Sequence, residues 1–241
     1  MEIELHRIPA FVINLDRSRE RWVRFSRSMK EVMPNIQIER VSGVDGRDFF
    51  RAGKGRPGNW FSSLRDWLFR REVVVDPAGD AVAPWNPEVL SRLRAEGFAG
   101  QKHLLDPVRT ALCLSHQRAL RHFLDRKPEA DWGLIFEDDT RPGESLASLP
   151  TDEIELIVPE DAEILFLHDR VWKRGRSQRD ASPDCEGWRI VRGGIGLEAY
   201  LVSRLGARKM LDAFRPVIKE CDIQLMTFME GYADLEAKQE M

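Results

Sequence analysis

A buried strand, a helix and a second strand open the chain, and this order limits the folds available to it. Residues 10–15 (AFVINL) are apolar and β-branched, which is typical of a strand covered on both faces. Apolar residues then recur at helical spacing from 22 to 33, and residues 36–41 (IQIERV) alternate as a second strand before a turn at 43–46. A strand, helix and strand at this spacing form a βαβ unit, so the sequence predicts an α/β fold with a mostly parallel sheet.

The rest of the chain continues the alternation after one irregular segment. Residues 51–108 contain loop-like stretches rich in Gly and Pro, so we expect an insertion or lid within a single domain that spans residues 1–241. Trp60, Trp67 and Trp85 form either a platform for a ring-shaped ligand or the core of that insertion. Ser203 is expected to cap a helix. The other predicted elements are helices at 109–126 and 222–230 and strands at 132–136, 163–168, 188–191 and 198–202.

Composition excludes several classes of protein. The chain of 241 residues is 42% hydrophobic and 32% charged, which allows a buried core and argues against disorder. Its net charge of -3 gives no bulk attraction to nucleic acid, so that class of partner is not expected. The three cysteines are odd in number and form no CxxC pair, which argues against a disulfide framework. With no signal peptide or membrane-spanning stretch, we expect a cytoplasmic protein that works in solution or at a membrane surface.

Three adjacent carboxylates, Glu137, Asp138 and Asp139, directly follow the apolar strand at 132–136. Ligands of open α/β sheets bind beyond the carboxyl ends of the strands, so these side chains point to a site. A divalent cation would relieve their mutual repulsion, and oxygen ligands favour Mg²⁺ or Mn²⁺. The alternative is a solvated acidic turn, closed by the Pro-Gly that follows it.

Arginines at the start of the first helix point to an anion. Arg17, Arg19 and Arg21 lie in or near its first turn, where positive charge opposes the helix dipole by about 0.3–1 kcal/mol per exposed charge. A bound phosphate would reverse that effect, because free N–H groups and arginines both attract it. The alternative is that the arginines pair with Glu20 and Asp16.

Four separated segments resemble the family 25 glycosyltransferases, a group that includes galactosyl- and glucosyltransferases of lipopolysaccharide biosynthesis. The segments, in the order that the family has them, are FVINLDRSRERW, ERVSGVDGRDF, LSHQRAL followed by LIFEDD, and LEAYLVSRLGARKML followed by Cys221 and Asp222. The resemblance spans residues 10 to 222, and four segments in order are far more specific than one.

The resemblance implies a GT-A fold, a nucleotide-sugar donor that is commonly UDP-linked, a divalent metal, and transfer of a hexose with inversion to a hydroxyl of a glycan, lipid-linked saccharide or peptide. It implies that Asp139 is the main metal ligand, with Asp138 beside it, and that Glu137 and Asp138 also contact the donor sugar. The residues that it places around the nucleotide and the donor pocket are Asn14, Arg17, Arg21, Asp45, Gly46, Ser115 and His116.

An inverting transfer needs a base that deprotonates the acceptor hydroxyl, and the candidates are Asp222, then Glu198, then Asp169. His168, at the end of a predicted strand, is a further candidate metal ligand or a structural histidine. The chain departs from the family before LSH, where Arg109 to Leu112 replace a Glu-Ile-Gly-Cys stretch. This departure leaves open an alternative function, a non-catalytic relative that binds a nucleotide sugar or a partner protein.

Overall fold

The structure, a computed structural model, describes the following residues: 2–47, 74–75, 81–82, 107–141, 155–167, 179–180, 189–190, 196–215, 217, 220–226 and 228–229. Most of the predicted insertion at 51–108 therefore lies outside the described residues. Within it the structure describes a two-stranded antiparallel pair and the first residues of a helix.

A mixed five-stranded sheet forms the centre of the described fold. Its strand order is β3-β2-β6-β11-β8, with β2 paired in parallel with both β3 and β6. β11 is antiparallel to β6 and to β8, so four strands run in one direction and one runs against them. The prediction of an α/β fold is confirmed, and the sheet is parallel except for β11. The strands span Ile38–Ser42 (β3), Ala10–Asn14 (β2), Trp132–Glu137 (β6), Ala199–Ser203 (β11) and Ile164–Phe166 (β8).

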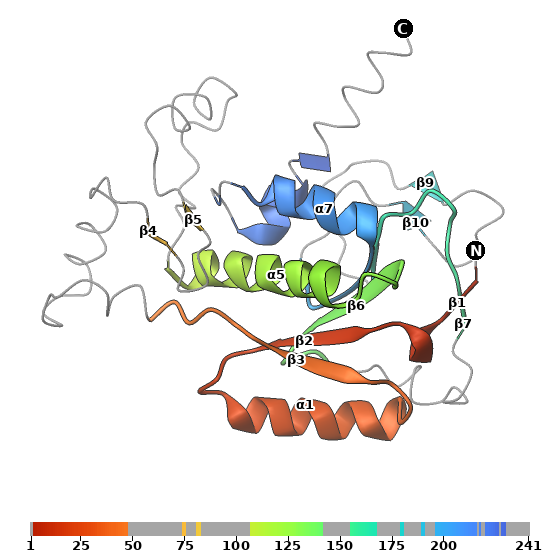
Figure 1. Cartoon of the computed structure of the whole chain (residues 1–241), viewed down its shortest axis with the longest axis horizontal. Helices are drawn as coiled ribbons and strands as arrows, with labels where there is room; N and C mark the ends of the chain where they lie inside the picture. Colours follow the sequence, from red (N-terminus) through yellow and green to blue (C-terminus); the bar gives the residue numbers. More distant parts are fainter. Residues whose placement is uncertain are drawn as a thin grey trace, which may run out of the picture.

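Helices cover both faces of this sheet (Figure 1). One face is packed by α1 (Arg19–Val32), whose buried Phe25 and Met29 join Val12 in one apolar cluster. The other face is packed by α5 (Pro107–Arg126) and α7 (Arg204–Ala213). Successive residues of β2 alternate between the two clusters, because side chains along a strand point to opposite faces. The run from Ala10 to Ile13 is apolar throughout for this reason.

Local chemistry sets the helix ends. Ser203 caps α7 as predicted, since its side-chain oxygen accepts a hydrogen bond from the Gly206 amide at 3.0 Å. Ser18 is the N-cap residue of α1 but makes no side-chain cap bond. Its carbonyl oxygen instead accepts from the amides of Arg21 and Trp22. The start of α1 is therefore held through the backbone of Ser18.

Three short antiparallel pairs and one helical turn complete the described elements. The predicted strand at 188–191 is confirmed as β10, and the predicted helix at 222–230 is described as helical at 221–226 and 228–229. No described helix combines the length and the apolar character that crossing a membrane requires. The pairs are β1 (Glu2–Glu4) with β7 (Glu155–Ile157), β4 (Val74–Val75) with β5 (Ala81–Val82), and β9 (Arg179–Asp180) with β10 (Arg189–Ile190); η1 spans Leu5–Arg7.

Candidate active site

The predicted site residues meet at the carboxyl edge of β2, β3 and β6. In the parallel pairing, Asn14 lies beside Ser42, and Ile13 lies beside Glu137. The acidic triplet therefore begins next to the end of β2, where the chain turns toward α1. This edge is where an open α/β sheet binds ligands.

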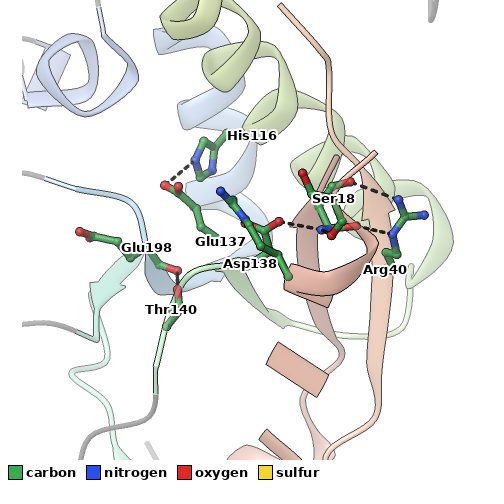
Figure 2. Close-up of polar contacts among 9 residues, drawn as sticks. Ser18, Arg40, His116, Glu137, Asp138, Thr140 and Glu198 are labelled. Carbon is green, nitrogen blue, oxygen red and sulfur yellow. Dashed lines mark hydrogen bonds and ion pairs between the residues drawn. The ribbon is translucent and has the colours of Figure 1, made fainter. Parts of the chain in front are cut away.

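Asp138 belongs to a buried network with the first strand and helix. Its Oδ2 accepts a hydrogen bond from Asn14 Nδ2 at 2.6 Å, and its Oδ1 pairs with Arg21 Nη2. The Asp138 side chain is only 2% exposed, so these contacts occupy it. Asn14 Oδ1 in turn accepts from Arg40 Nε at 2.8 Å (Figure 2). Arg21 and the acidic triplet therefore lie at the same edge of the sheet.

Arginines and aspartates pair along the rest of this α1 side of the edge. Arg17 Nε donates to Asp45 Oδ2 at 2.6 Å, which ties the start of α1 to the turn after β3. Arg40 Nη2 donates to Asp16 Oδ1 at 2.5 Å, so Asp16 pairs with Arg40 and not with an arginine of α1. Arg17, Arg21 and Arg40 are thus each matched by a carboxylate.

These contacts lower the pKa values of two carboxyl groups. Hydrogen bonds from Arg40 and Ser42 hold the pKa of Asp16 below its usual 3.8. Burial raises the pKa of Asp45, but hydrogen bonds from the Arg47 amide and the Arg17 guanidinium outweigh it, and the net pKa is lowered. Both groups are therefore ionised at neutral pH and hold their arginines in place.

A second feature of the edge is an acidic cleft of about 500 Å³ on the other side of Asp138. Glu137 and Asp139 open into it, whereas Asp138 points to α1. The candidate bases Glu198 and Asp222 also line this cleft. Its other lining residues are Arg109, Leu112, Gly196, Leu197, Glu220 and Cys221.

Backbone contacts fix the carboxylates of the cleft wall. Asp222 Oδ2 accepts from the Gly196 amide at 3.0 Å, and its Oδ1 accepts from the Ile223 amide at 2.8 Å. Gly196 has a φ of 102°, and a Cβ there would lie 2.2 Å from Glu198 Oε2. Gly196 is therefore required by its backbone conformation, which residues with a Cβ rarely adopt.

The turn after β6 is fastened to the residue before β11. The Glu198 carbonyl oxygen accepts from the Glu137 amide at 2.8 Å and from Thr140 Oγ1 at 2.5 Å (Figure 2). Arg109 of α5 makes an ion pair of 2.6 Å with Glu220, so the described arginine in the cleft wall has its charge matched. The remaining four lining carboxylates give the cleft a strongly negative character.

The two LSH residues lie behind the cleft wall. Ser115 Oγ accepts from the Val44 amide at 2.8 Å and donates to the Ala111 carbonyl at 2.6 Å, so it fastens the turn that carries Asp45 and the buried Gly46 to α5. His116 is fully buried and contacts Glu137. Both residues were predicted to line the donor pocket, and both are buried in the structure.

Sequence reasoning did not single out Arg40, Thr140 or Tyr200. Tyr200 had a signal, because a tyrosine inside the apolar strand AYLV must find a partner for its hydroxyl group. Arg40 had none, since alternation within IQIERV indicates only a solvated face. Two other predicted residues, His168 and Asp169, lie outside the described residues.

The donor chemistry of the cleft fits a hard divalent cation. Glu137 and Asp139 offer carboxylate oxygens, and Mg²⁺ commonly uses one or two protein carboxylates together with substrate phosphates. Asp138 is a poorer metal ligand, because its two carboxylate oxygens already contact Arg21 and Asn14. Across the described ranges, no three His, Cys, Asp or Glu side chains form a metal-binding group. Such a cation would thus depend on phosphate oxygens of a bound substrate for part of its coordination.

No protein-family model and no curated protein matches this chain. The functional argument therefore depends on the resemblance of the four segments and on the geometry of the edge.

Proposed function

We propose that this chain is a glycosyltransferase similar to those of family 25, with a GT-A fold, that moves a hexose from a nucleotide sugar to a hydroxyl group. The observation that carries the proposal is the division of the acidic triplet. Asp138 holds the arginine-bearing helix, while Glu137 and Asp139 open into the acidic cleft. Anion-binding and cation-binding side chains therefore lie next to each other, as transfer from a diphosphate donor requires.

Arrangement of the elements supports this proposal. A sheet of parallel strands with one reversed strand and helices on both faces is compatible with a GT-A fold. The family-like segments come from residues 11–22, 39–49, 114–120, 134–139 and 197–211, and the contacts above join described residues of each around one edge.

The donor would bind on the α1 side. A diphosphate fits beside Arg17 and Arg21, where its oxygens would compete with Asp45 and Asp138 for the guanidinium groups. The turn that carries Asp45 and Gly46 would then approach the nucleoside. UDP is the nucleotide that the family resemblance favours.

Asp139 and Glu137 would hold Mn²⁺ or Mg²⁺ at the junction of the two sides. When bound, such a cation neutralises negative charge that develops on the diphosphate leaving group. Asp138 contributes by keeping Arg21 against the same edge, so that a second positive charge faces the leaving group.

The acceptor would enter the cleft from solvent, and a carboxylate must remove the proton from its hydroxyl group. Asp222 is the first candidate, because two backbone amides fix its orientation within the cleft wall. Glu198 is the second, held close to Gly196. A glycan, a lipid-linked saccharide or a peptide would supply the hydroxyl group.

The test is a mass-spectrometric screen of the purified chain against a panel of nucleotide sugars, with and without Mn²⁺ or Mg²⁺. We expect release of the nucleoside diphosphate from at least one donor, and loss of that release when a chelator is added. Binding seen by thermal shift but no release with any donor or acceptor would contradict the enzyme and favour a non-catalytic relative.

A further inference from the structure

Three polar side chains form a chain that runs from the core to the acidic cleft. Tyr200 of β11 and His116 of α5 are both 0% exposed, and Glu137 at the end of β6 lines the cleft. His116 Nδ1 lies 3.2 Å from the Tyr200 hydroxyl oxygen. His116 Nε2 lies 3.5 Å from Glu137 Oε1, the contact that Figure 2 draws between these two residues. Each residue comes from a different element, so the contacts depend on the tertiary fold.

The contacts determine where the imidazole carries its proton. A carboxylate only accepts hydrogen bonds, so an attractive contact with Glu137 requires a proton on Nε2. In the neutral ring Nδ1 then accepts, and the Tyr200 hydroxyl group donates to it. Burial, and then the nearby Cys221 and Glu137, raise the pKa of Tyr200 well above its usual range, so this hydroxyl group keeps its proton.

The neighbouring Cys221 thiol does not compete for this proton. A hydrogen bond with Cys113, burial, and the charges of Asp222 and Glu137 raise the pKa of Cys221, which therefore stays a thiol. Within the described residues His116 Nε2 makes no hydrogen bond, and Glu137 is the acid that it faces. A slight approach of Glu137 would satisfy this buried group.

We propose that His116 is a positioning residue, which holds the Glu137 carboxylate toward the cleft while Tyr200 fixes the tautomer of the imidazole. The inference concerns the acidic cleft of the proposed glycosyltransferase, and its role in turnover rests on that proposed function. The contact itself does not, because it joins groups of this chain alone. The contacts of Tyr200 and His116 deepen the proposal, because they give Glu137 a fixed orientation. Asp139, in the turn after β6, does not receive an orientation from these contacts.

Nitrogen-15 NMR of the full chain with labelled histidine tests the contact without any activity. We expect the His116 ring to show a proton on Nε2, a mixture of tautomers in Tyr200→Phe, and a shifted Nε2 signal in Glu137→Gln. Glu39→Gln is the matched control, because Glu39 pairs with His122 at 2.5 Å and should alter only that ring. A proton fixed on Nδ1, or a His116 signal unchanged in Glu137→Gln, would overturn the proposal.

Kinetics test the consequence. We expect His116→Leu to lower kcat for donor release by about 10- to 100-fold with little change in donor KM, and His116→Gln to recover part of it, because its amide donates to Glu137. Equal kcat in His116→Leu and the unmodified chain would overturn the positioning role. If the unmodified chain releases no nucleotide, the proposed function fails, while the NMR result still decides the contact. If the His116 variants do not fold, donor-release kinetics and histidine NMR of Glu137→Gln and Tyr200→Phe decide whether His116 positions Glu137.

Discussion

The two sides of the carboxyl edge differ in how their charges are balanced. On the α1 side, Arg17, Arg21 and Arg40 each pair with an aspartate. In the cleft, Arg109 pairs with Glu220, and four more carboxylates line the same wall. Under the proposed function, an arriving anion would exchange partners with the aspartates on the α1 side, and a cation or a proton from the ligand would balance charge in the cleft. Neighbouring residues of one triplet should therefore respond differently to the same substitution.

The largest effect should come from the acidic cleft. Asp139→Asn should lower donor release by at least about 100-fold, because the cation loses its main carboxylate ligand. The free energy of unfolding should change by less than about 0.5 kcal/mol, since Asp139 is exposed. Initial rates with Mn²⁺ and urea unfolding measure the two quantities. Asp212→Asn, an exposed aspartate on α7, is the control, and activity retained in Asp139→Asn would refute the metal role.

The adjacent residue should show the opposite pattern in stability. Asp138→Ala removes the carboxylate partner of Arg21 and one of the two acceptors of the Asn14 amide, so we expect a loss of about 2–3 kcal/mol in the free energy of unfolding. Urea denaturation measures it. Asp131→Asn, an exposed aspartate before the other end of β6, should change little. An Asp138→Ala chain as stable as the unmodified one would mean that the buried network does not hold α1.

A substitution on the α1 side should change the affinity for the donor and not the rate of the chemical step. Arg17→Gln should raise the donor KM about tenfold and leave kcat nearly unchanged, because it removes one charge-assisted contact to the diphosphate. Arg24→Gln, an exposed arginine on the same helix, should leave KM unchanged. Steady-state kinetics at fixed ionic strength compare them. A fall in kcat with constant KM would place Arg17 in the chemical step and not in donor binding.

Sequence reasoning located the first half of this edge because its signals are local. The apolar run AFVINL, the helical spacing after it and the acids at the end of β6 each depend on neighbouring residues only. The direction of β11 was not predictable, because apolar patterns are the same in parallel and antiparallel strands and the chain returns through residues 140–198. Leu112 shows a similar limit. A leucine one helical turn before the buried His116 would be placed by sequence alone on the same buried face, yet Leu112 is 36% exposed at the cleft.

The different directions of Asp138 and of its neighbours Glu137 and Asp139 could not be predicted from the sequence either. Three consecutive acids look equivalent in a linear chain, and only the turn after β6 decides that Asp138 points to α1 while its neighbours face the cleft. Thr140 and the Glu198 carbonyl fix that turn through contacts 58 positions apart. Arg40 illustrates the same point, since its role depends on Asn14 and Asp16 beside it in the sheet and not on its own neighbours in sequence.

The smallest expected effect is a pH dependence of stability that belongs to the α1 side alone. The folded-state pKa values of Asp16 and Asp45 are lowered, so their pairs contribute stability at neutral pH, and this contribution is lost as the pH falls below about 5. Asp16 is exposed, Asp45 is half-buried, and both arginine partners are open to solvent, so together the two pairs contribute less than about 1 kcal/mol. Asp16→Asn should lower Tm at pH 7 slightly and make the fall of Tm between pH 6 and 3 shallower. Asp125→Asn, an exposed aspartate on α5, should leave that slope unchanged, and an equal slope in Asp16→Asn would show that the Arg40 pair adds nothing to folding.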